Sequence, residues 1–66
     1  MNEDAVWNIA EGLVTLFGSD AGSVAAKMFA RNIEDGEDVR ANCWTRVLAA
    51  IDELHRLNAN DRALVN

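Results

Sequence analysis

Glycine, and not proline, divides this chain, and the segments between glycines carry hydrophobic residues at helical spacing. Proline is absent, and Gly18 and Gly36 stand where one apolar stripe ends and the next begins. Hydrophobic residues that recur every three to four positions form one face of an α-helix, and glycine commonly follows the last helical residue. The sequence therefore predicts an all-α fold, a three-helix bundle with helices over about residues 3–17, 20–34 and 38–57.

The ends of the first two helices are the most specific local expectations. Asn2 and Asp20 have side chains suited to cap a helix N-terminus, and Gly18 and Gly36 are expected to end the two helices, Gly36 in a Schellman motif. Gly12 falls inside the first helix, where glycine is unfavourable. We expect it to allow close packing by a neighbouring helix, and a hinge is the alternative.

The size of the chain limits how stable one copy can be. A chain of about this length buries only about 60% of the surface that its unfolded form exposes. The single Cys43 excludes a disulfide within the chain, and the single His55 excludes a Cys/His zinc site. We therefore expect one helical domain over residues 1–66 that packs as a dimer, with 58–66 a tail that is either flexible or docked on the partner.

The third helix carries a wider apolar face than a small monomer needs. This face and the two tryptophans predict the contact surface, because tryptophan is enriched at binding hot spots. For the tryptophans themselves, anchoring the core is the favoured interpretation and an interface anchor is the alternative, and in a homodimer both roles can hold. The predicted interface residues are Trp7, Trp44, Leu48, Ile51, Leu54, Leu57 and Leu64.

The charge excludes some classes of partner. Eleven acidic and six basic residues give a net charge of -5, and the basic residues are spread along the chain. Such a chain repels nucleic-acid backbone and anionic lipid. No apolar run approaches the ~18 residues of a membrane span, and the start is acidic where a secretory leader is basic. We expect a cytoplasmic protein that binds neither nucleic acid nor membrane.

Chemistry-bearing residues are few. Asp52 and His55 lie three apart, a spacing that suits a metal, but the pair occurs once, and a half-buried His55 is the favoured interpretation. Cys43 near a helix start is expected to be a packing residue, with a reactive thiol as the alternative. The acidic segment 34–38 lacks the ligand spacing of a calcium loop. We expect no catalytic residue, no metal and no cofactor, and therefore no enzyme.

A resemblance adds to this interpretation. A pattern that covers about three quarters of the chain runs through Trp7, Ala10, Gly18, Ala21, Ala25 or Ala26, Gly36-Glu37-Asp38, Ala41, Trp44, Ala50-Ile51 and Leu54. This pattern resembles that of small bacterial helical proteins grouped as a domain of unknown function. The family resemblance implies an all-helical cytosolic fold and assigns no activity.

Two functions follow as expectations. The first is a small acidic interaction or regulatory module that self-associates through its apolar face. The alternative is an acidic inhibitor that blocks a basic nucleic-acid-binding surface on another protein, as some phage-encoded antagonists of defence systems do. Mimicry of a phosphate backbone needs acids in rows on one face, whereas these acids cluster at helix starts, where they offset the helix dipole.

Overall fold

The chain is helical almost throughout. A computed structural model describes the backbone of residues 2–65 and the side chains of residues 2–59. Helix α1 spans Glu3–Phe17, the 3-10 turn η1 spans Gly18–Asp20, α2 spans Ala21–Glu34 and α3 spans Asp38–Val65. No strand occurs between residues 2 and 65. The all-α prediction is confirmed.

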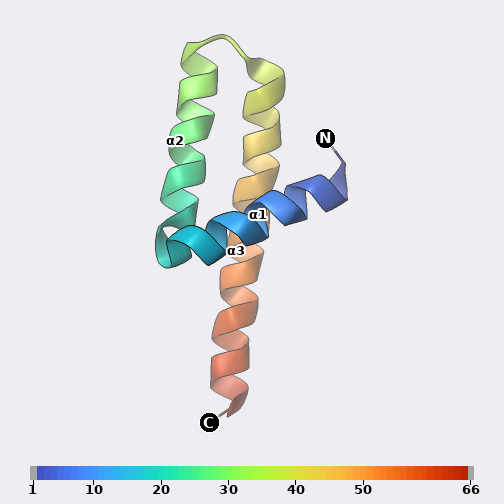
Figure 1. Cartoon of the computed structure of the whole chain (residues 1–66), viewed down its shortest axis with the longest axis vertical. Helices are drawn as coiled ribbons and strands as arrows, with labels where there is room; N and C mark the ends of the chain where they lie inside the picture. Colours follow the sequence, from blue (N-terminus) through green and yellow to red (C-terminus); the bar gives the residue numbers. More distant parts are fainter. Residues whose placement is uncertain (1, 66) are drawn as a thin grey trace.

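The helices do not form the predicted three-helix bundle. Helices α2 and α3 lie side by side as an antiparallel hairpin, and α1 runs across both of them near the base of α2 (Figure 1). Because η1 joins α1 to α2 without a non-helical residue, residues 3–34 form one sharply bent helical stretch, and α3 is the second. The bend at η1 turns α1 across the hairpin.

The caps explain where the elements begin and end. The Asn2 side chain accepts a hydrogen bond from the Ala5 amide at 2.8 Å, as predicted. Gly18 ends α1 with a φ of 56°, which glycine adopts without the strain of a side chain. Asp20 makes no side-chain cap, contrary to expectation, because it already has helical dihedrals in η1 and no separate helix start remains there.

The Schellman motif at Gly36 is confirmed. Gly36 has a φ of 73°, its amide donates to the Ile33 carbonyl at 3.1 Å, and the Glu37 amide donates to the Asn32 carbonyl at 2.8 Å. This bond pair satisfies carbonyls at the end of α2 and turns the chain into α3. The acidic segment 34–38 therefore forms the tip of the α2–α3 hairpin.

The third helix is longer than predicted. It continues past Leu57 to Val65, so the segment expected to be a tail is a helical extension of α3 within the described residues. The sequence there contains neither glycine nor proline, and its polar residues change what the helix exposes without breaking it. Beyond α1, this end of α3 projects away from the other helices (Figure 1).

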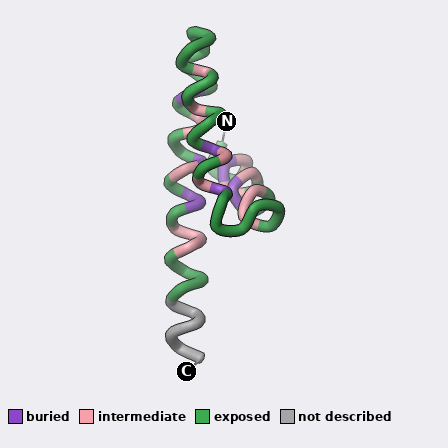
Figure 2. The backbone as a smooth tube through the Cα atoms, turned by 90° about the vertical axis from the view of Figure 1, so that its left-hand side faces the viewer, coloured by how far each residue is buried: buried purple, intermediate pink, exposed green. Residues whose placement is uncertain are grey.

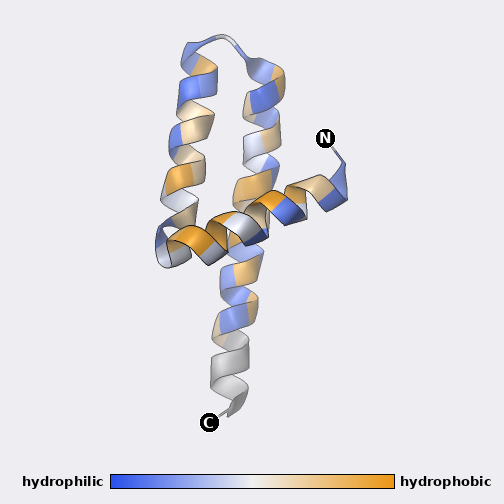
Figure 3. Ribbon diagram, viewed as in Figure 1, coloured by the Kyte–Doolittle hydropathy of each residue, from blue (hydrophilic) through white to orange (hydrophobic). Residues whose placement is uncertain are grey.

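The core lies where α1 crosses the hairpin. Buried residues gather at this crossing, and the hairpin tip is exposed (Figure 2). Hydrophobic residues follow α1 and the adjoining parts of α2 and α3, while the turn at the tip is hydrophilic (Figure 3). Small side chains let helix axes approach closely. The buried core cluster is Val6, Ala10, Ala21, Ala25, Val47, Ala50 and Ile51.

Candidate functional site

The largest hydrophobic side chains remain at the surface. Among residues 2–59 no leucine, phenylalanine or tryptophan is buried, and the largest fully buried side chains are Ile51 and Val47. The core cluster is built mainly of alanine and valine, with Ile51 as its largest side chain. The exposed large hydrophobic residues are Leu16, Phe17, Met28, Ile33, Val39 and Leu57.

Both tryptophans are half-buried. Trp7 on α1 and Trp44 on α3 pack against the core cluster and keep part of each ring at the surface. The arrangement is compatible with both predicted roles, because each ring contacts the core and remains accessible. The role of the tryptophans in a contact with a partner stays a prediction.

The other predicted interface residues separate into several environments. Leu48 and Leu54 are half-buried against the core, and Leu57 is 49% exposed. Ile51 is 2% exposed, so this side chain belongs to the core of the single chain and has to be removed from the predicted surface. The Leu64 side chain lies outside the described residues. The predicted stripe on α3 therefore combines interior and surface positions.

A shallow cleft of about 300 Å³ lies beside Trp7, between the first half of α1 and the middle of α3. Its charged lining residues are Glu3, Arg46 and Glu53, and the Trp7 ring provides an apolar wall. Arg56 pairs with Glu53 at 2.9 Å, which offsets part of the charge there. Charges of both signs in one open cleft favour no single class of ligand.

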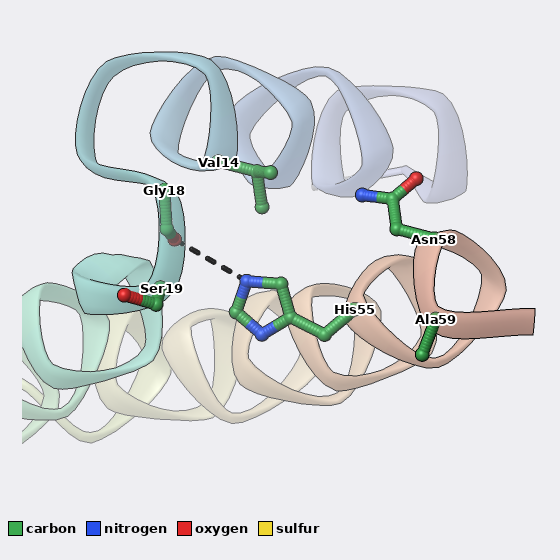
Figure 4. Close-up of a pocket in the computed structure, with 6 residues that line it drawn as sticks. All are labelled: Val14, Gly18, Ser19, His55, Asn58 and Ala59. Carbon is green, nitrogen blue, oxygen red and sulfur yellow. Dashed lines mark hydrogen bonds between the residues drawn. The ribbon is translucent and has the colours of Figure 1, made fainter. Parts of the chain in front are cut away.

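A second cleft of about 270 Å³ lies on the far side of the crossing. The His55 ring points from α3 toward η1, and its Nε2 donates to the Gly18 carbonyl oxygen at 3.2 Å (Figure 4). A carbonyl can only accept, so the proton of this tautomer is on Nε2. The half-buried position predicted for His55 is observed, and the bond ties α3 to the turn between α1 and α2.

Asp52 and His55, the pair whose spacing suits a metal, are not joined by further candidate ligands within the described residues. The Asp52 side chain is 81% exposed and lies 3.7 Å from Arg56, not at His55. Within the described residues, no three histidine, cysteine, aspartate or glutamate side chains form a group that could hold a metal ion. Cys43, a free and half-buried thiol, is the sixth residue of α3, beyond the first turn where the helix dipole acts most strongly.

Most of the acidic residues between residues 2 and 59 lie at helix ends. Glu34, Asp35, Glu37 and Asp38 surround the hairpin tip, where Arg40 pairs with Glu37 at 3.0 Å. Glu3 and Asp4 occupy the first turn of α1, where they complement the helix dipole. The expected clustering at helix starts is only partial, because Glu34 and Asp35 lie at the C-terminal end of α2, and Glu11, Asp52 and Glu53 lie within helices.

Val39 is an exposed apolar residue that the predicted interface does not include. It is 79% exposed on the first turn of α3. Its spacing of four from Cys43 and eight from Val47 could have placed it on the same stripe. Its charged neighbours, Asp38 and Arg40, obscured that pattern.

No family model, curated protein or solved structure matches this chain. The resemblance to small bacterial helical proteins therefore stays a prediction. Within the described residues, none of the helices is both long enough and apolar enough to cross a membrane.

Proposed function

We propose that this chain is a small acidic interaction module that self-associates through its exposed apolar surface. One observation carries the proposal: several large hydrophobic side chains of the described residues, among them Leu16, Met28 and Val39, are exposed around a core made mostly of alanine. Monomers seldom leave a large contiguous apolar area exposed unless it is an interaction site.

The exposed area supports a second copy as the partner. The chain exposes 4813 Å², whereas a compact monomer of 7.2 kDa exposes about 4,100 Å² by the usual scaling with mass. The surplus of about 700 Å², to which the projecting end of α3 also contributes, is of the same order as the ~800 Å² that each partner contributes to a standard protein interface.

Sedimentation velocity and thermal unfolding over a range of protein concentrations test the proposal. We expect a mass near twice that of the chain and a melting temperature that rises with concentration, because association stabilises the folded state by mass action. The association should persist at high salt, since apolar contacts are not screened. A mass of one chain at every concentration, with an unchanging melting temperature, contradicts it.

The salt series also separates the proposal from the acidic-inhibitor function. An inhibitor that binds a basic surface can remain a monomer, and it loses that partner as salt rises because the attraction is electrostatic. The acids at the hairpin tip and helix starts provide no row that favours this alternative.

A further inference from the structure

The face of the α2–α3 hairpin that α1 covers continues beyond α1 toward the hairpin tip. On α3, Val39, Cys43, Val47 and Ala50 follow one another at spacings of four, four and three, and so share one stripe. Under α1, Val47 and Ala50 are 1% and 5% exposed, while nearer the tip Cys43 is half-buried and Val39 is 79% exposed. One stripe therefore passes from core to open surface.

Helix α2 shows the same change. Ala21, Ala25 and Met28 share a stripe at spacings of four and three. The two alanines are fully buried in the cluster with α1, and Met28, one turn nearer the tip, is 39% exposed. The covering helix α1 does not reach this end of the hairpin (Figure 1).

One side of α1 borders this open area. Val14 lines the cleft with His55, on the part of α3 beyond the crossing. Leu13 and Leu16 lie on a different side of α1 from Val14. Because Val14 is on the side toward the end of α3, Leu13 and Leu16 lie on the side toward the hairpin tip. Leu16 is 77% exposed there. We name this area the hairpin face, and it consists of Leu13, Leu16, Met28, Val39 and Cys43.

We infer that the hairpin face is covered by the hairpin face of a second copy, packed antiparallel about a two-fold axis near Cys43. The inference rests on the proposed self-association and specifies its surface. Helix α1 stands one helix diameter, about 10 Å, above the hairpin. A second hairpin packed on the hairpin face lies in the same layer as α1. Its tip then reaches α1 of the first copy without displacing it.

The charges select the antiparallel direction. Between residues 27 and 46 the four acids lie together at the tip, at Glu34, Asp35, Glu37 and Asp38, and the four basic residues are Lys27, Arg31, Arg40 and Arg46. Antiparallel packing brings each acidic tip level with Lys27 and Arg46 of the other copy. Parallel packing would bring the two acidic tips together, which like-charge repulsion opposes.

The first test compares Val39→Glu with Leu57→Glu by sedimentation velocity. Both residues are exposed, so neither change disturbs the core, and both add the same charge. We expect Val39→Glu to raise the dimer dissociation constant at least about tenfold, since it places a carboxylate in a desolvated contact. Leu57→Glu, on α3 beyond the crossing, should dimerise like the parent.

The second test uses Cys43, the only cysteine in the chain. A short bismaleimide should join two copies through Cys43, because the proposed axis places the two thiols close together. In the Cys43→Ser background, Thr45→Cys puts a thiol two residues away on the exposed side of α3, and it should cross-link at least about tenfold more slowly.

The outcomes separate the inference from the proposed function. A dimer that loses affinity on Val39→Glu and cross-links at Cys43 supports both. A dimer that survives Val39→Glu, dissociates on Leu57→Glu and resists the Cys43 cross-link overturns the hairpin face and leaves self-association standing. A parent chain that is monomeric throughout the concentration series overturns both.

Discussion

The two ends of the α2–α3 hairpin carry similar residues on one face and differ in what covers them. At the base, under α1, Ala25 and Val47 are 0% and 1% exposed. At the tip, on the same stripes, Met28 and Val39 are 39% and 79% exposed. The side chains are apolar in both places, so the position of α1, and not hydrophobicity, decides which of them form the core.

This difference also explains why the chain keeps its largest residues outside. Close helix contact at the base depends on alanine, which buries little area per residue. The exposed side chains nearer the tip, Met28 and Val39, are larger than alanine. A stable base and an uncovered tip are therefore two results of one packing arrangement.

The largest expected effect comes from comparing a charge on the buried side of α2 with a charge on its exposed side, in two separate variants. Ala25→Asp should destabilise the fold by more than about 3 kcal/mol, enough to unfold so small a domain, because the carboxylate would lie unpaired in the core. Ala26→Asp, at an exposed neighbouring position, should cost less than about 1 kcal/mol. Urea unfolding followed by circular dichroism measures both, and equal costs would show that α1 does not cover Ala25.

A smaller effect compares two valines on one stripe of α3. Val47→Ala should cost about 2 kcal/mol, because it removes buried methyl groups and leaves a cavity. Val39→Ala should change the stability of the dilute monomer by less than about 0.5 kcal/mol, as expected for an exposed position. If the two changes have the same effect in dilute solution, the contrast between base and tip is wrong.

The smallest expected effects concern two glycines, one at the tip and one in the covering helix. Gly36→Ala should destabilise by about 1 kcal/mol, because its φ of 73° strains any residue with a Cβ. Gly12→Ala should stabilise α1 by about 0.5–1 kcal/mol, since helical alanine is favoured and a Cβ there meets no atom within 4 Å.

Thermal unfolding of the two glycine variants gives the sign directly. A loss of stability on Gly12→Ala would restore the packing role that the sequence suggested for this residue. A neutral Gly36→Ala would mean that the hairpin turn does not need a positive φ.

Local signals in the sequence predicted the helix ends well. The cap at Asn2 and the Schellman glycine at Gly36 depend on residues within a few positions of one another, and both were predicted. The end of α3 was predicted at Leu57 because the next residues are polar. Polarity alone does not stop a helix, and α3 continues to Val65.

The candidate site could be predicted only in part. The half-buried Trp44 and the exposed Leu57 are compatible with an apolar surface on α3, but Ile51 faces the core and Val39 was missed. The bond between His55 and Gly18 joins residues 37 positions apart. Spacing along one helix cannot show where another helix crosses it.

The sequence by itself determined the helical character of the chain, its glycine turns and its apolar stripes, because these depend on neighbouring residues and on a fixed period of 3.6. Only the tertiary structure decided which part of each stripe became core. The bend at η1 directs α1 across the base of the hairpin, and one helix of 15 residues cannot also cover the tip. The division between core and open surface is therefore set by the direction and length of α1.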